Sequence, residues 1–162
     1  MSPPRRKLDS PILSVVLVEP QIPPNTGNIA RLCAASNCHL ILAGPLGFTL
    51  DDTHLKRAGL DYWEHVSWEH VPDVETLLAN RPSRSFHLLS ARASVPYTQI
   101  PAEPGDCLVF GKETTGLGPE LLGRFPRQTY TIPLAEPNVR SLNLSSAVAI
   151  VTYDVLRRLK GF

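Results

Sequence analysis

Short runs of apolar residues recur along this chain, and stretches with helical spacing separate them. Leu13–Val18 and His39–Ala43 are runs of this kind, each short enough for a buried strand. Between them, a helix is expected to begin at Asn25, a good N-cap residue, and to continue to about Asn37. Strands that alternate with helices are typical of a single α/β domain with a mostly parallel sheet flanked by helices.

The same patterns predict the rest of the fold. Further strands are expected at Tyr62–Val66, Ser85–Leu89, Cys107–Phe110 and Thr129–Ile132. Further helices are expected at Asp51–Ala58, Pro72–Asn80, Gly118–Arg124 and Leu144–Lys160, and the last should be the longest. Ligands of parallel α/β sheets bind beyond the carboxyl ends of the strands, so the loops that follow strands should hold the site.

Charge neither demands nor excludes a nucleic-acid partner. A formal net charge of +1 lacks the strongly basic signature of many nucleic-acid-binding proteins. Basic residues are nevertheless clustered near positions 5–7, 56–57 and 157–160, and such clusters can form a local phosphate-binding face. Solvated surface is the alternative for any one cluster. Residues 1–10 should be a flexible polar arm, and residues 11–162 the folded domain.

Several classes of protein are disfavoured. No apolar run is long enough to span a bilayer, and the basic N-terminal segment is not followed by the apolar core of a signal peptide. Neither the three cysteines nor the five histidines have the spacing of a metal site, so no metal is expected. Buried thiols are the favoured interpretation of Cys33, Cys38 and Cys107, and the setting should be cytoplasmic.

The loop at residues 19–31 is the first candidate for chemistry. Asn25, Gly27 and Asn28 at a helix start would offer amide groups to an anion such as a phosphate. Arg31 follows within two turns and is the lone cation of a helix that is otherwise mostly small and apolar. By composition alone Arg31 would be a surface residue, and its place near the expected phosphate site weakens that alternative.

Two later loops are also rich in residues that suit ligand binding. Gly111 and Gly116 in the segment 110–118 allow close backbone approach, although a plain connection is as good an explanation. Glu113 could hold a ligand hydroxyl or amine, cap the next helix, or pair with an arginine. Around residue 143, four polar side chains precede or open the long helix, where one N-cap would suffice; they are Ser141, Asn143, Ser145 and Ser146.

These three loops resemble the motifs of the SPOUT superfamily of methyltransferases, in particular its small TrmL (YibK-like) branch of tRNA ribose 2′-O-methyltransferases. The first motif reads EPQIPPNTGNIARLC and is followed by GPLGF and LKRAGLDYWE. The second reads LVFGKETTGLG, and the third reads IPLAEPNVRSLNLSSAVAIVTYD. The resemblance covers Leu13 to Leu159, and the departures are the N-terminal arm and Lys112, where a proline is common.

The resemblance implies a C-terminal deep trefoil knot that holds S-adenosylmethionine, with S-adenosylhomocysteine as the product. The cofactor would contact a set of residues drawn from the later motifs: Leu88, Gly111, Glu113, Gly116, Ile132, Ser141, Asn143 and Tyr153. A homodimer is also implied, with each site completed across the interface. Such a dimer would contain each basic cluster twice, which would compensate for the low net charge of one chain in binding RNA.

The same resemblance implies methyl transfer to a tRNA ribose at the wobble nucleotide, a cytidine or a uridine derivative at position 34. Arg31 would be the catalytic residue and Asn25 would help to position the ribose or Arg31. Two alternatives stay open at this point. One is a related enzyme that methylates another ribose of tRNA or rRNA, and the other is a non-catalytic RNA-binding protein on the same fold.

Overall fold

A single six-stranded sheet runs through the molecule. The computed structural model describes residues 10–51, 53–59 and 62–160. All the strand pairs are parallel, and the spatial order is β3-β2-β1-β5-β4-β6. The strands are β1 (Ser14–Val18), β2 (His39–Ala43), β3 (Ser67–Val71), β4 (Phe86–Leu89), β5 (Cys107–Phe110) and β6 (Thr129–Tyr130). The predicted parallel α/β sheet is therefore confirmed.

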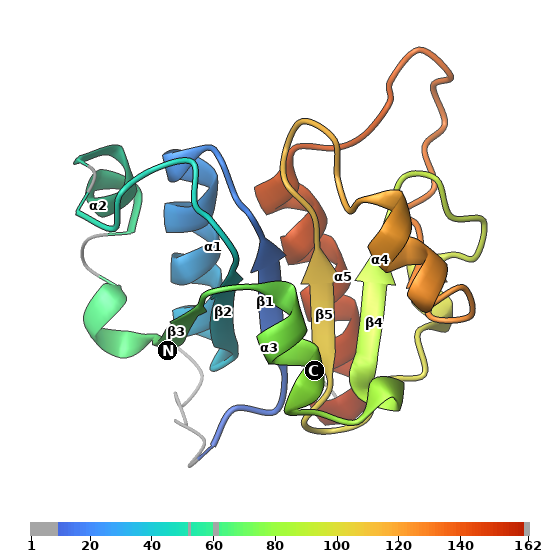
Figure 1. Ribbon diagram of the computed structural model, residues 1–162, viewed down its shortest axis with the longest axis horizontal. Coiled ribbons are helices and arrows are strands. Elements are labelled where there is room, and N and C mark those ends of the chain that lie inside the picture. The colour runs from blue at the N-terminus through green and yellow to red at the C-terminus, as the bar shows by residue number, and fades with distance from the viewer. Residues whose placement is uncertain (1–9, 52, 60–61, 161–162) are drawn as a thin grey trace, which may run out of the picture.

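Helices cover both faces of this sheet (Figure 1). They are α1 (Pro23–Ser36), α2 (Thr53–Gly59), α3 (Val74–Ala79), α4 (Pro119–Arg124) and α5 (Leu144–Lys160), with 3-10 turns η1 (Trp63–His65), η2 (Ser83–Ser85) and η3 (Tyr97–Gln99). Residues of α1 and α5 pack against one face, and residues of α3 and α4 pack against the other. Among the described residues, no helix has the length and apolar character that crossing a membrane requires.

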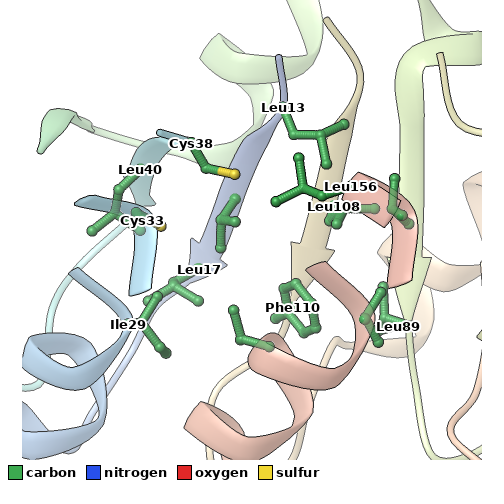
Figure 2. Packing of buried hydrophobic residues seen from close by; sticks show 14 of the residues in the cluster. Leu13, Leu17, Ile29, Cys33, Cys38, Leu40, Leu89, Leu108, Phe110 and Leu156 are labelled. Atoms are coloured by element: carbon green, nitrogen blue, oxygen red, sulfur yellow. The ribbon is translucent and has the colours of Figure 1, made fainter. Parts of the chain in front are cut away.

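The central strands are buried on both faces, which explains why they read as continuous apolar runs. Every residue of β1 and β5 is buried. On the face of α1 and α5, Leu17 and Phe110 lie among side chains of both helices, including Ile29 of α1 and Leu156 of α5 (Figure 2). Residues of α1 and α5 therefore share one core with β1 and β5.

Most predicted elements are confirmed, and one strand is wrong. The segment predicted as a strand at Tyr62–Val66 holds η1, and the strand of this region is β3 at Ser67–Val71. The physical reason is that β3 is an edge strand whose residues are mostly exposed. Its sequence, SWEHV, therefore lacks the apolar run that marks the inner strands.

Several helix and strand ends also differ from the prediction, most by one or two residues. Helix α1 begins at Pro23, so Asn25 lies inside the first turn and is not the N-cap. Helix α3 begins after Pro72, because Asp73 caps it by accepting a hydrogen bond from the Thr76 amide at 2.7 Å. Strand β6 ends at Tyr130, and Thr131 forms an isolated bridge with Pro96 instead.

Two further expectations concern chain termini and threading. The predicted arm at residues 1–10 lies, except for Ser10, outside the described residues. The trefoil knot is a matter of how the chain passes through itself, and it stays a prediction. In the described ranges, no three His, Cys, Asp or Glu side chains are grouped as metal ligands.

Candidate active site

A large cavity lies where the loops leave the carboxyl ends of β4, β5 and β6. Its volume is about 800 Å³, within the range of roughly 300–1,000 Å³ that is usual for small-molecule sites. Three segments line it: 89–93 after β4, 110–117 after β5, and a set of residues between 131 and 147. The structure thus brings together five of the predicted cofactor residues: Gly111, Glu113, Gly116, Ile132 and Ser141.

The segment 110–117 forms a tight, closed turn. Lys112 and Gly116 form an antiparallel bridge, and the Gly116 amide donates to the Lys112 carbonyl at 2.9 Å. Gly116 has a φ of +67°, a left-handed conformation that favours glycine. A Cβ on Gly111 would lie 2.1 Å from the carbonyl carbon of Gly116 and 2.2 Å from the nitrogen of Leu117. Both glycines are therefore required by the turn itself.

Glu113 joins this turn to the start of α1. Its two carboxylate oxygens accept hydrogen bonds from the amides of Gln21 at 2.9 Å and Ile22 at 3.0 Å. The side-chain amide of Asn25 donates to the same carboxylate at 3.4 Å. The sequence suggested that Glu113 could cap the next helix, and the structure contradicts this, because α4 has no side-chain cap. Glu113 instead holds the segment that leads into α1.

Two more contacts reinforce this connection. The Thr114 hydroxyl donates to the Gln21 side-chain carbonyl at 2.8 Å. The Lys112 ammonium lies 3.7 Å from the Glu19 carboxylate. Lys112, the position at which the sequence departs from the family pattern, is thus part of the contact between the 110–117 turn and the segment before α1. We call these contacts, together with those of Glu113, the Glu113 strap.

The start of α1 does not offer the free amides that the sequence suggested. Pro23 and Pro24 occupy the first turn and have no N–H group. The amides of Asn25 and Thr26 both donate to the Ile22 carbonyl, at 3.1 and 3.4 Å. The amides of Gln21 and Ile22, just before the helix, already donate to the Glu113 carboxylate, so an anionic group is present at this helix start.

Arg31 lies in the third turn of α1, apart from the cavity. It is eight residues beyond Pro23, or about 12 Å along the helix axis. Its side chain is exposed, and its guanidinium carbon lies 4.8 Å from the centre of the Tyr62 ring. Arg31 is not one of the described residues that line the cavity. Within one chain, Arg31 and the cavity are therefore two separate sites.

The third predicted loop stands out from the body of the molecule. Residues 133–141 are all exposed, and Figure 1 shows this segment, in orange-red, rising clear of the sheet. The side-chain hydrogen bonds within it are local, because the backbone amide and the side-chain amide of Asn138 both donate to the Glu136 carboxylate. Asn143 caps α5, accepting from the Ser145 amide at 2.9 Å and from the Ser145 hydroxyl at 2.6 Å.

The remaining predicted residues flank the cavity. Leu88 is buried within β4, and the cavity wall begins at the next residue, Leu89. Tyr153 is 41% exposed on α5 and lies outside the cavity lining. The sequence interpretation missed Ser90 and Arg92, which line the cavity after β4. Their position directly after a predicted strand was the available signal, but the segment has no glycine to draw attention to it.

The cysteines do not contribute a nucleophile. Cys33, Cys38 and Cys107 are all buried thiols outside any disulfide, as predicted. Burial is the main cause that raises the pKa of Cys107 to about 11, and burial with the neighbouring Cys38 raises the pKa of Cys33 well above its usual value. The thiols of Cys33 and Cys107 therefore stay protonated and unreactive at neutral pH.

Known proteins share both the sequence and the fold. Residues 12–153 match the SpoU rRNA Methylase family. The tRNA (cytidine(34)-2'-O)-methyltransferase of Burkholderia pseudomallei (strain 1106a) is 46% identical over 151 residues, which cover 91% of this chain and 96% of that protein. The corresponding protein of Escherichia coli (strain K12) is 43% identical, with coverage of 91% and 94%.

A solved structure described as "Structural insights into the 2-OH methylation of C/U34 on tRNA" is 43% identical and has a TM-score of 0.85. The alignment covers 93% of this chain and 97% of that one. An AdoMet-bound rRNA methyltransferase from Sinorhizobium meliloti is 25% identical, has a TM-score of 0.79, and is covered over 56% of its length. With its three motifs in order and its sheet matched by these structures, this chain belongs to the SpoU methylase family of the SPOUT class.

Proposed function

We propose that this protein is a tRNA ribose 2′-O-methyltransferase that uses S-adenosylmethionine and acts on the wobble nucleotide, cytidine or a uridine derivative at position 34. The observation that carries the proposal is the cavity of about 800 Å³, built on the glycine turn at residues 110–117. It is supported by relatives above 40% identity that are named for this reaction.

The residues of the cavity fit a methyl donor of this kind. Gly116 is exposed and carries no side chain, which leaves backbone of the 110–117 turn open at the cavity, and Ile132 and Leu134 supply apolar surface. Glu113 and Glu136 also line the cavity, and their negative charge suits a ligand with a positive centre, although the Glu113 carboxylate is itself held by the amides of Gln21 and Ile22. S-adenosylmethionine would supply the electrophilic methyl group of a sulfonium, and S-adenosylhomocysteine would be the product.

Arg31 is proposed to act on the ribose. A ribose hydroxyl is a poor nucleophile at neutral pH, so its oxygen must be oriented and its developing negative charge stabilised. A guanidinium stays protonated in proteins, which makes Arg31 suited to hold the adjacent phosphate and the forming alkoxide. Tyr62 beneath the guanidinium limits the directions in which Arg31 can point.

Because Arg31 lies apart from the cavity of its own chain, the proposal requires a second copy. We expect a homodimer in which Arg31 of one chain serves the cavity of the other. Exposed apolar side chains on the same helices support this: Ile22 next to α1, and Ile150 and Tyr153 on α5, are each about 40% exposed. Asn25 would act indirectly, through its hydrogen bond to Glu113.

The reaction is tested by incubating bulk tRNA with the protein and deuterated S-adenosylmethionine, followed by nucleoside mass spectrometry. A labelled 2′-O-methylcytidine or 2′-O-methyluridine derivative that maps to position 34 is expected. A label at another ribose would favour the related-enzyme alternative. No label, with RNA still bound, would favour the non-catalytic alternative, and a base-methylated product would refute the proposal.

The shared site is tested by complementation. The variants Arg31→Ala and Gly111→Ala should each be inactive, and only Arg31→Ala should keep donor binding in calorimetric titration. If the chains reassort at random, mixed dimers contain one intact site, so about one quarter of the wild-type activity should return. Absence of any recovery, with mixed dimers present by native mass spectrometry, would contradict the shared site.

A further inference from the structure

A second, smaller hollow lies near the opposite edge of the sheet from the cavity. Leu50, Lys56, Trp63 and Trp68 line it, and its volume is about 200 Å³. Strand β3, which carries Trp68, is one edge of the sheet, whereas the cavity adjoins β6 at the other. We call these four residues the tryptophan hollow. None of them takes part in the reaction proposed above.

The two tryptophans differ in how they are held. Their rings meet edge to face, with centroids 5.1 Å apart and planes at 73°. Trp63 is partly buried against the core, whereas Trp68 is 38% exposed on the edge strand. Leu50 is also 38% exposed. An anchored ring thus fixes a second ring that presents apolar surface to solvent, an arrangement that core packing alone does not need.

One cation lines this aromatic surface, and two more belong to segments next to it. Lys56 lines the hollow, and Lys56 and Arg57 form the last turn of α2. Arg31 stacks over Tyr62, the residue directly before Trp63. Exposed aromatic rings beside Lys or Arg are the usual platform for unpaired nucleotides, because the ring stacks on a base and the cation attracts its phosphate.

Two nearby acids, Glu69 and Asp51, do not line the hollow. Glu69 follows Trp68, so its side chain points to the other face of the sheet, where it pairs with His39 at 3.1 Å. The pKa of Asp51 is lowered mainly by a hydrogen bond with the Thr49 side chain, and Lys56 contributes by its charge. Asp51 does not line the hollow.

We propose that the tryptophan hollow binds one unpaired base of the RNA substrate, with Trp68 as the stacking platform and Lys56 at a phosphate. The volume supports a single base, since it falls below the roughly 300 Å³ at which sites for whole cofactors begin. The inference rests on the proposed function for the identity of the RNA. Because Tyr62 and Trp63 are consecutive, a base held there would belong to a nucleotide near the one that Arg31 serves.

The direct test is binding of a fluorescent RNA hairpin with a seven-nucleotide loop, compared with a fully paired duplex of the same length. Trp68→Leu keeps apolar bulk without an aromatic face and should weaken hairpin binding on the order of tenfold. Trp68→Phe should restore most of the affinity. Duplex binding and titration with S-adenosylmethionine should be the same in all three proteins.

Lys56 is tested by salt dependence. Lys56→Gln should lower the slope of log affinity against log salt for the hairpin by about 0.7, the value for one phosphate of a single strand. Arg127→Gln is the matched control, because Arg127 is exposed next to β6 at the opposite edge of the sheet. An equal slope change in both variants would overturn a specific role for Lys56.

The outcomes separate this inference from the proposed function. Methyl transfer by the wild type with an unchanged KM for tRNA in Trp68→Leu would refute the hollow and leave the function standing. Hairpin binding that depends on Trp68, without methyl transfer by the wild type, would support RNA binding at the hollow and refute the proposed function. A change of oligomeric state in Trp68→Leu, measured by light scattering, would assign the hollow to a second copy of the chain and overturn the RNA assignment.

Discussion

Two loops enclose the proposed donor cavity, and they are built in opposite ways. The turn at residues 110–117 is closed by the Lys112–Gly116 bridge and fastened to α1 by the Glu113 strap. The loop at residues 133–141 is exposed throughout. Both segments line the cavity, so the contrast lies in how they are held and not in where they lie.

This difference separates a fixed wall from an adaptable one. Lys112, Glu113 and Thr114 of the turn are paired within the chain, so we expect its shape not to depend on a ligand. The exposed loop makes few contacts of its own and belongs to the class of segments that open at low free energy. We therefore expect changes in the turn to affect both folding and donor binding, and changes in the loop to affect mainly the response to ligand.

The largest effect is expected for Gly111→Ala, which tests the fixed wall directly. The new Cβ would collide with backbone of Gly116 and Leu117, so the turn must deform. We expect a loss of about 3 kcal/mol in the free energy of unfolding and no measurable donor binding by calorimetry. Gly123→Ala is the control, because a Cβ there meets nothing and lies in helix α4. Equal behaviour of both variants would mean that the turn is not rigid.

The second-largest effect is expected for Glu113→Ala, which removes the carboxylate contacts of the Glu113 strap but keeps the Lys112–Gly116 bridge that closes the turn. The amides of Gln21 and Ile22 lose their acceptor, at a cost of about 1–3 kcal/mol in denaturant unfolding. Glu113→Gln keeps one acceptor oxygen and should lie between wild type and Glu113→Ala. If the two variants are equally stable, the carboxylate is not what holds the start of α1.

Limited proteolysis compares the two loops in one experiment. Trypsin should cut after Arg140 in the exposed loop much faster than after Lys112 in the fastened turn. Saturating S-adenosylhomocysteine should slow the cut at Arg140 on the order of tenfold, since a ligand that orders the loop opposes its opening. The rate is followed by intact-mass measurement. An equal rate of cleavage at Arg140 with and without S-adenosylhomocysteine would show that the loop at residues 133–141 does not close on the ligand.

The smallest effect is expected for Asn143→Ala, at the boundary of the exposed loop. Loss of the cap on α5 should lower the free energy of unfolding by about 1 kcal/mol, and Asn143→Asp should preserve it. Ser146→Ala alters an exposed hydroxyl three residues later and should fall within about 0.5 kcal/mol of wild type. A larger loss in thermal unfolding for Ser146→Ala would show that Asn143 is not the main cap.

The sequence predicts the interior of this molecule better than its edges. The bounds of β2, β5 and α5 agree with the prediction, because buried strands and a long amphipathic helix carry a strong apolar pattern. Strand β3 was missed because an edge strand can be polar on most of its length. The order of the strands depends on which elements meet in space, and a single sequence does not record it.

The candidate site shows the same division. The glycines at positions 111 and 116 indicated a close backbone turn, and the structure confirms it. Asn25 was expected to cap α1 because local rules favour asparagine there. The acceptor for that helix start is instead Glu113, 91 positions from Ile22 in sequence, so no local signal could have revealed it.

The pairing of β1 with β5 also sets a schedule for synthesis. Ser14 lies opposite Cys107, so a ribosome that adds about 5–20 residues per second makes the two partners roughly 5–20 s apart. During that interval the nascent chain can align β1 with β2, but the other side of β1 must wait. An unfinished apolar strand edge is a template for wrong pairing, so the vulnerable period of this protein in the cell falls before Cys107 is translated.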